Sequence, residues 1–291
     1  MGVSTFSIVG YDQTTGDLGI AVASRFPSVG AVVPWAAPGV GAVAVQALPG
    51  PQFGPRGLRL LTDGRTPEQT VAELLSGDGD AGLRQIGVVA ADGRAASYTG
   101  SGCDDWAGGV SGDGYAAQGN ILAGPRVVGA MEETYLQADG PLAERLLQAL
   151  AAGEDAGGDG RGRQAAALLV VRVDGGYLRS SDRYVDLRSD DHPTPVAELE
   201  RLLVLHRLLF EPPRAEDLVR IDGPLARDVQ AILGLAGIPY DGVGGSYDAG
   251  TRTALRYLYG CENLEERWRD DDMIDSAALA RLRSRYPATP S

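Results

Sequence analysis

Lysine is absent from this sequence: all 26 basic residues among the 291 are arginine. Mechanisms that depend on a lysine base or on a Schiff base are therefore excluded. Cysteine and histidine are also scarce, with only Cys103, Cys261, His192 and His206, and their spacing does not match a zinc site. We therefore expect neither a metal nor a cofactor.

Positive charge is outnumbered, with 39 acidic residues against 26 basic ones and a net charge of −13. Nucleic acids and anionic membrane surfaces both attract a positive field, so neither is expected as a partner. The sequence also lacks an apolar run long enough to span a membrane, and its N-terminus lacks the pattern of a secretory signal. These absences predict a cytoplasmic protein.

The residues that are present are typical of a globular protein, with 44% hydrophobic and 22% charged content. The length suits a large domain followed by a small one. Pro212-Pro213 and the polar stretch that follows them are typical of a linker. We predict a domain over residues 1–211, a linker over 212–223 and a second domain over 224–291.

Hydrophobic periodicity predicts a mixed architecture. An alternating strand at 5–12, a turn and an apolar strand at 18–25 predict a β-hairpin. Further strands are predicted at 29–33, 40–46, 86–90, 95–98, 115–122, 164–173 and 184–188, and helices at 57–61, 67–75, 125–136, 141–151 and 195–210. Strands and helices come in separate runs, which favours an α+β layered fold over a βαβ parallel sheet. Three amphipathic helices are predicted after the linker, at 225–235, 249–259 and 276–285.

Six short stretches of the first domain carry a resemblance to a known family. They are TFSIV at 5–9, VVPWA at 32–36, GPRGL at 54–58, QGNILAG at 118–124, GDGRGRQ at 158–164 and DRYVDLR at 182–188. In this combination and order they resemble the family called domain of unknown function 1028, which is placed among the N-terminal nucleophile (Ntn) hydrolases. The resemblance implies a four-layer αββα sandwich, and the family name supplies no substrate.

The C-terminal residues 225–285 resemble a peptidoglycan-binding domain that accompanies this family. The matching residues are Val229, Gln230, Leu233, Gly237, Asp241, Gly242, Gly245, Ser246, Tyr247, Thr251, Ala254 and Leu255. The resemblance implies a small three-helix domain and a peptidoglycan fragment as a ligand. The alternative is a helical bundle that packs on the main domain and binds no sugar.

Membership of the Ntn class implies that Thr5 is the nucleophile. Such enzymes use the side chain of their first residue as nucleophile and its own α-amino group as base. An α-amino group titrates at about 7.7–8.0, which suits proton abstraction near neutral pH without histidine or lysine. Thr5 becomes N-terminal only if the Ser4–Thr5 bond is cleaved. Ser4 and then Ser7 are the alternative hydroxyls, and a structural threonine at a strand edge is the alternative role.

Two further residues complete the predicted catalytic group. Asn120 follows Gly119 at the end of a predicted strand, and its amide N–H₂ and the nearby backbone N–H groups could donate to a developing oxyanion. The alternative is a turn-forming Gly-Asn pair.

Arginines are the predicted substrate-binding residues. Arg25, Arg56, Arg161 and Arg163 could each hold a carboxylate bidentately, and Asp159 lies among them in the sequence. The alternative for each is a structural or surface ion pair.

Two functions remain open at this point. The first is a hydrolase that cleaves a C–N amide bond of a small or peptide-like substrate after Thr5 is exposed. The second is a non-catalytic binding or scaffold protein in which an Ntn-like domain is fused to a peptidoglycan- or protein-binding helical module. A homo-oligomer is expected in either case.

Overall fold

The structure is a computed structural model that describes residues 5–287. Ser4, the alternative nucleophile, lies outside the described residues. The chain divides into two units, residues 1–202 and 203–291, each of which is described by itself. Helix α5 (Pro195–Phe210) crosses the boundary between them. The mixed α and β composition of the first unit confirms the predicted class.

The first unit is built on a six-stranded antiparallel sheet with β1 near its middle. The spatial order of its strands is β10 (Arg183–Ser189), β9 (Ala165–Val171), β2 (Leu18–Ser24), β1 (Thr5–Tyr11), β8 (Tyr115–Asn120) and β7 (Gly108–Gly112). Strand β1 pairs with β2 on one side and with β8 on the other. The first predicted strand is therefore the element around which this sheet is arranged.

The turn between β1 and β2 confirms the predicted hairpin. The Asp12 carboxylate accepts hydrogen bonds from the backbone N–H groups of Thr14 and Thr15, at 2.8 and 3.1 Å. Gly16 has a φ of 77°, in the left-handed region that favours glycine. These local preferences fix the register in which Phe6 pairs with Ala23.

A second sheet of four antiparallel strands packs against the first. Its strands are β3 (Pro34–Ala37), β4 (Gly41–Ala47), β5 (Arg84–Ala90) and β6 (Ala95–Thr99). Between the sheets lies an apolar core, which includes Val9, Ile20, Val22, Ala42 and Ala44. The many alanines and glycines of these strands allow the two sheets to approach closely.

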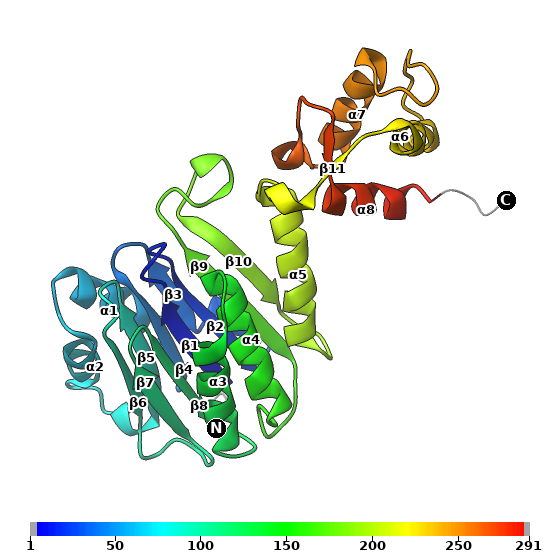
Figure 1. Ribbon diagram of the computed structural model, residues 1–291. Coiled ribbons are helices and arrows are strands. Elements are labelled where there is room, and N and C mark those ends of the chain that lie inside the picture. The colour runs from blue at the N-terminus through cyan, green and yellow to red at the C-terminus, as the bar shows by residue number, and fades with distance from the viewer. Residues whose placement is uncertain (1–4, 288–291) are drawn as a thin grey trace. The chain divides into compact units, whose positions relative to one another are not determined.

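Helices cover the outer face of each sheet (Figure 1). Helices α3 (Arg126–Gln137) and α4 (Leu142–Asp155) lie on the six-stranded sheet, and α1 (Phe53–Thr62) and α2 (Pro67–Leu75) lie on the four-stranded sheet. Gly19 of β2 permits the close approach of α4, because a Cβ there would lie 2.8 Å from Leu146. Strands β1 and β2 are thus covered on both faces and almost entirely buried.

The structure corrects several details of the sequence prediction. The apolar run at 29–33 is not a strand: Ser28 has a φ of 55°, a short 3₁₀ helix follows at Val29–Ala31, and Val29 is buried in the core. A hydrophobic run alone cannot distinguish a buried turn from a buried strand. Strand β7 was not predicted, because three of its five residues are glycine, which is depleted in strands.

The second unit contains helices α6 (Gly223–Leu235), α7 (Ala249–Cys261) and α8 (Ser276–Arg285). Each helix begins after an aspartate, Asp222, Asp248 or Asp275, whose carboxylate caps the first turn. The unit also contains two short antiparallel strands that were not predicted, β11 (Leu218–Arg220) and β12 (Met273–Asp275). Among the described residues of the whole chain, no helix is both long and apolar enough to cross a membrane.

Candidate functional site

Thr5 is the first residue of β1, and it is completely buried. It pairs directly with Asn120 at the end of β8. On the other side, its hydroxyl donates a hydrogen bond to the Ser24 hydroxyl at the end of β2, at 3.3 Å. The structure therefore brings the predicted nucleophile and the predicted oxyanion residue together.

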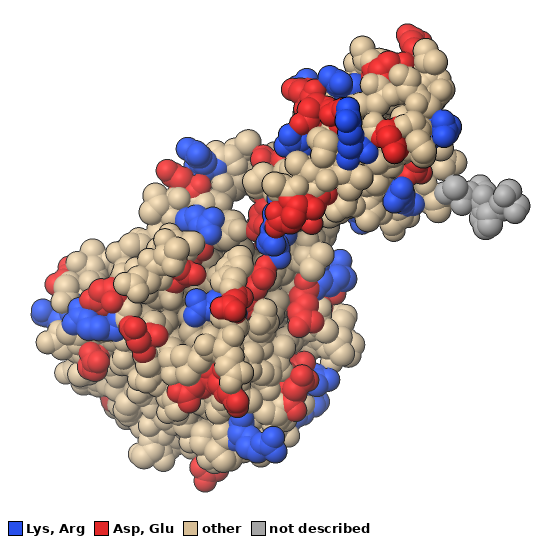
Figure 2. Space-filling model, viewed as in Figure 1, with Lys and Arg blue, Asp and Glu red and all other residues tan. Residues whose placement is uncertain are grey.

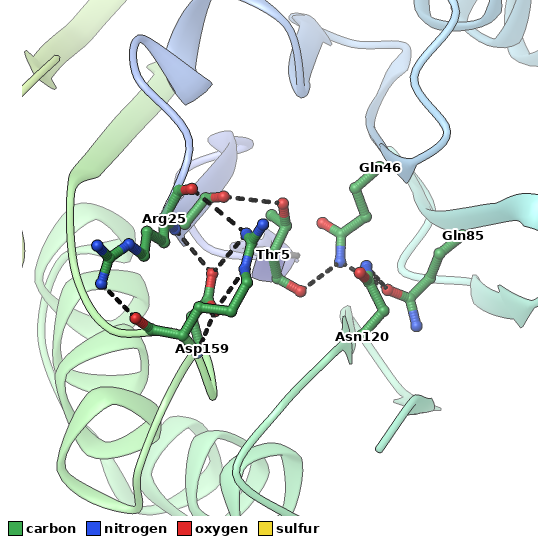
Figure 3. Close-up of polar contacts among 8 residues, drawn as sticks. Thr5, Arg25, Gln46, Gln85, Asn120 and Asp159 are labelled. Atoms are coloured by element: carbon green, nitrogen blue, oxygen red, sulfur yellow. Dashed lines mark hydrogen bonds and ion pairs between the residues drawn. The ribbon is translucent and has the colours of Figure 1, made fainter. Parts of the chain in front are cut away.

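Four buried amide side chains, Gln46, Gln85, Gln118 and Asn120, form a polar group between the two sheets, which we call the amide cluster. Gln46 donates from its amide nitrogen to the Thr5 carbonyl at 3.2 Å and to the Gln85 oxygen at 2.8 Å. Asn120 donates to the same Gln85 oxygen at 2.9 Å. Figure 3 shows Gln46, Gln85 and Asn120 on one side of Thr5. The cluster thus connects the Thr5 backbone to Asn120 through two glutamines.

Gln85 fixes the orientation of the amide cluster. Its oxygen accepts from two amides, and its nitrogen lies 2.7 Å from the Gly119 carbonyl and 2.9 Å from the Thr99 hydroxyl. All of its amide atoms therefore have partners, as a buried polar group requires. One N–H of Asn120 is directed to Gln85, and the predicted catalytic residue Gly119 contributes a backbone carbonyl to the same group.

The amide cluster continues along β1 to Ser7, the other candidate hydroxyl. Ser7 donates to the Gln46 oxygen and accepts from the Gln118 nitrogen, both at 2.7 Å. A Cβ at Gly87 would overlap the Gln118 amide, so this glycine makes the space that Gln118 occupies. Ser7 is fully buried and bonded on both sides, as a residue of the polar core.

On the opposite side of Thr5, Asp159 organises the glycine-rich loop that follows α4. Its carboxylate accepts from the backbone N–H of Arg25 at 2.7 Å and from the backbone N–H of Arg161 at 2.9 Å. The Arg161 guanidinium pairs with the same carboxylate at 3.1 Å, and the Arg25 guanidinium donates to the Arg161 carbonyl. Three of the predicted substrate-binding residues are therefore together, joined to one another (Figure 3).

A pocket of about 630 Å³ lies beside this loop. Ser24, Asp159 and Arg163 contribute to its wall, together with Glu154 at the end of α4. Arg163 and Glu154 form an ion pair with an Nε–Oε2 distance of 3.3 Å. Burial raises the pKa of the Glu154 carboxyl, while the charge of Arg163 opposes this rise. The pocket wall therefore contains an ion pair of one acidic and one basic side chain.

Arg56 is not joined to these residues. It is exposed on α1, and its guanidinium donates to the Glu73 carbonyl of α2 at 2.9 Å. On the face of the molecule in Figure 2, arginines lie next to acidic side chains and do not gather in one region. Among residues 5–287, no group of three or more histidine, cysteine, aspartate or glutamate side chains could hold a metal ion.

Ser24, Gln46, Gln85 and Glu154 were not singled out from the sequence. Gln46 and Gln85 nevertheless carry a signal in the sequence, since each is an amide residue next to the apolar run of its strand, in GAVAVQA and RQIGVVA. A buried amide requires partners, so such a residue indicates a polar network. Nothing in the local sequence of Glu154 shows that it faces a pocket, because this depends on the loop that follows it.

The second unit has a separate pocket of about 770 Å³ between the loop after α6 and the outer side of α7. Tyr240, Asp241, Thr253 and Tyr257 contribute to its wall. Tyr257 is 66% exposed, so its ring is accessible to a ligand. This pocket has the aromatic and polar groups of a small-molecule site.

Comparisons with known proteins give a consistent result for both units. The model of a "Family of unknown function (DUF1028)" matches residues 5–199, and that of a "Putative peptidoglycan binding domain" matches residues 209–282. The chain is similar to protein SPO2555 from Silicibacter pomeroyi, whose crystal structure is described with the DUF1028 family model. The two sequences are 36% identical, and the two structures have a TM-score of 0.65 over 70% of this chain and 86% of that one. No curated protein matches the chain.

Proposed function

The chain belongs to the DUF1028 family, whose function is unknown, and from this premise we propose that its first unit is an N-terminal-nucleophile amidohydrolase. The observation that carries the proposal is the position of Thr5. It begins a central strand, its hydroxyl meets Ser24, and its register partner is Asn120. A hydroxyl at the first position of a buried strand, with amide donors beside it, is the arrangement that this chemistry needs.

The layers of the first unit support the same class. Two antiparallel sheets pack face to face and are covered on their outer faces by α3 and α4 and by α1 and α2 (Figure 1). We propose that this is the αββα sandwich of the Ntn hydrolases. Fold alone does not specify a reaction, so the proposal depends on the residues at Thr5.

The proposed reaction begins after the Ser4–Thr5 bond is cleaved. The Thr5 α-amino group accepts the hydroxyl proton while Oγ1 attacks the carbonyl carbon of a substrate amide. An N–H of Asn120 and neighbouring backbone N–H groups stabilise the oxyanion. The C–N bond then breaks, the leaving amine takes the proton, and water hydrolyses the acyl–Thr5 ester to release the acid. Arg25, Asp159 and Arg161 shape the substrate side of the site, and Arg163 faces the pocket.

Cleavage of the Ser4–Thr5 bond is the direct test. Intact-mass spectrometry of the purified full chain, incubated between pH 6 and 9, should show loss of the first four residues together with the appearance of amidase activity. Thr5→Ala should remain uncleaved and inactive. The control is Thr14→Ala, which removes an exposed hydroxyl from the hairpin turn and should behave like the unchanged chain. A Thr5→Ala variant with full amidase activity would refute the role of Thr5.

The second candidate function is binding to peptidoglycan, with the first unit acting as a scaffold and not as an enzyme. It is favoured by the family match at residues 209–282 and by the pocket beside Tyr257. Aromatic side chains offer flat apolar faces with a polar edge, which suits them to sugar rings.

A sedimentation assay with insoluble peptidoglycan tests this candidate. The full chain should sediment with the polymer, and Tyr257→Ala should weaken retention about tenfold, which corresponds to about 1.4 kcal/mol. Tyr177→Ala is the matched control, since Tyr177 is 57% exposed and belongs to the first unit. Failure of the unchanged chain to bind would remove this candidate.

Two organisational proposals accompany these functions. We propose functional domains at 1–211 and 224–291, joined by residues 212–223, and a homo-oligomeric protein in solution. Limited proteolysis followed by mass spectrometry should release fragments cut between 212 and 223. Light scattering of the intact chain measures its mass against the 30.4 kDa of one copy, and a monomer at all concentrations would contradict the oligomer.

A further inference from the structure

We infer that the pocket beside Thr5 binds the α-amino acid end of a substrate, with Glu154 recognising its ammonium group and Arg163 its carboxylate. The inference deepens the proposed hydrolase function by naming a substrate class. The inference rests on the proposed function where it says that the bound molecule is a substrate. Binding of an amino acid to the pocket can be measured without any reaction.

The pocket has the position that a substrate site requires. Its wall includes Ser24 and Asp159, and the Ser24 hydroxyl lies 3.3 Å from the Thr5 hydroxyl. Asp159 in turn accepts from the backbone of Arg25, the residue that follows Ser24. Ser24 therefore connects the pocket to the hydroxyl of the proposed nucleophile, at the same end of β1 and β2.

The charges in the pocket suit a zwitterion. The side chains of Glu154 and Arg163 are 12% and 47% exposed, so the acid is largely removed from water while the base reaches it. The ion pair between them has an Nε–Oε2 distance of 3.3 Å, so it is formed through the Nε side of the guanidinium. An ammonium group beside Glu154 would compensate its lost hydration, and a substrate carboxylate could form a bidentate pair with the guanidinium of Arg163.

The other acids of the pocket are less suited to an ammonium group. The Asp159 carboxylate already accepts from two backbone N–H groups and pairs with Arg161. Asp155 is exposed at the rim, where water screens its charge. Glu154 is therefore the carboxylate that combines burial, an adjacent cation and a place in the wall.

The remaining wall provides room for a side chain and an amide. Its apolar part consists of Phe6, Ala23, Ala165, Pro193 and Pro195, and backbone of the glycine-rich loop completes the wall. The volume of about 630 Å³ is within the range of sites that hold a small organic molecule. A single amino acid would leave space for the acyl or amine group on the other side of the scissile bond.

Calorimetric titration of the full chain with three probes tests the assignment of each charge. The probes are L-alanine, N-acetyl-L-alanine, which lacks the ammonium group, and L-alaninamide, which lacks the carboxylate. Glu154→Gln should weaken L-alanine and L-alaninamide about tenfold, the equivalent of about 1.4 kcal/mol, and leave N-acetyl-L-alanine unchanged. Arg163→Gln should weaken L-alanine and N-acetyl-L-alanine and leave L-alaninamide unchanged.

Matched controls separate this inference from general effects of charge removal. Glu73→Gln and Arg65→Gln make the same two changes in an ion pair at α2, outside the pocket, and should bind all three probes as the unchanged chain does. A melting temperature for each variant verifies that it folds.

The inference and the proposed function can fail separately. If the unchanged chain does not bind L-alanine, or if Glu154→Gln and Arg163→Gln bind all probes equally well, the inference is refuted even when the Ser4–Thr5 bond is cleaved. If the predicted probe pattern is found but Thr5 is never exposed, the pocket is an amino acid site and the hydrolase proposal fails.

Discussion

The space between the two sheets has two ends that are equally buried and chemically opposite. At one end the Thr5 backbone carbonyl and the Ser7 hydroxyl bond to the amide cluster, and at the other end Val9 and Ile20 pack with Ala42. Strand β1 belongs to both ends, because residues 5, 7 and 9 point to the same face of the sheet. Burial alone therefore cannot explain why one end is polar.

The difference shows where the fold buries side chains at a cost in free energy. An apolar side chain in this layer stabilises the protein simply by leaving water, whereas an amide must first replace its bonds to water. The amide cluster meets this requirement through a connected set of hydrogen bonds from Ser7 to Asn120. A fully hydrogen-bonded network holds its side chains in one arrangement, as a preorganised site requires. Valine side chains in these positions would avoid the cost of removing amides from water.

The largest expected effect comes from breaking the polar end at its centre. Gln85→Leu keeps the volume but removes the acceptor shared by the Gln46 and Asn120 amides and the donor to the Gly119 carbonyl. We expect the free energy of unfolding to fall by about 4 kcal/mol, because more than one buried polar group loses its partner. Urea denaturation measures the loss.

The same variant should also slow cleavage of the Ser4–Thr5 bond, because the Asn120 amide is no longer held in one orientation. A loss below about 1 kcal/mol would contradict the network, since it would mean that water enters and replaces the glutamine.

A smaller effect is expected from crowding the polar end. Gly87→Ala places a methyl group where the Gln118 amide lies, and the displaced amide would lose its bonds to Ser7. Overpacking of this kind costs about 2 kcal/mol. Gly79→Ala is the control, since nothing lies within 4 Å of its added Cβ, and its stability should change little. Equal stabilities for the two variants would show that Gln118 is free to move.

The apolar end should respond more weakly and without any effect on chemistry. Ile20→Val removes one methylene from a fully buried side chain and should lower the free energy of unfolding by about 1 kcal/mol. Cleavage of the Ser4–Thr5 bond should continue at the rate of the unchanged chain. If Ile20→Val slowed cleavage as strongly as Gln85→Leu, the two ends would not be functionally distinct.

The two ends also differ in how far the sequence predicts them. The hairpin of β1 and β2 follows from alternation and from the turn residues between them, so both the strands and Thr5 could be placed. Asn120 was predicted as a site residue because it follows Gly119 at the end of a predicted strand. Its pairing with Thr5 depends on β8, which lies more than a hundred residues away in the chain. Partners that meet through tertiary pairing leave no local pattern.

The same limit explains the residues that sequence reasoning missed. Gln46, Gln85 and Gln118 lie on three different strands and form one group only after the two sheets pack together. The strand β7 was missed because glycine gives no strand signal, although a neighbouring strand supports it. The arginines were found as a group, yet Arg56 belongs to α1 and contacts α2, which composition could not show.

The smallest expected effect is a pH dependence at the pocket beside the polar end. Burial holds the pKa of Glu154 above its ordinary value, so folding favours its protonated form. This contribution to stability is present below the ordinary pKa of the carboxyl and is lost as the pH rises through the raised pKa. Arg163 opposes the shift, while Asp155 and Glu200 add to it. Glu154→Gln, which stays neutral, should therefore gain in melting temperature relative to the unchanged chain between pH 4 and pH 7.

Glu68 provides a control of opposite sign. The Thr66 hydroxyl lowers the pKa of this carboxyl, so its contribution to stability is present above the ordinary pKa and is lost as the pH falls. Glu68→Gln should thus lose melting temperature relative to the unchanged chain as the pH rises from 3 to 7. Differential scanning calorimetry of the three proteins gives both differences. If the melting temperatures of the two variants changed with pH in the same way, Glu154 would be solvated like a surface carboxylate. The conclusion that burial raises its pKa would then be wrong.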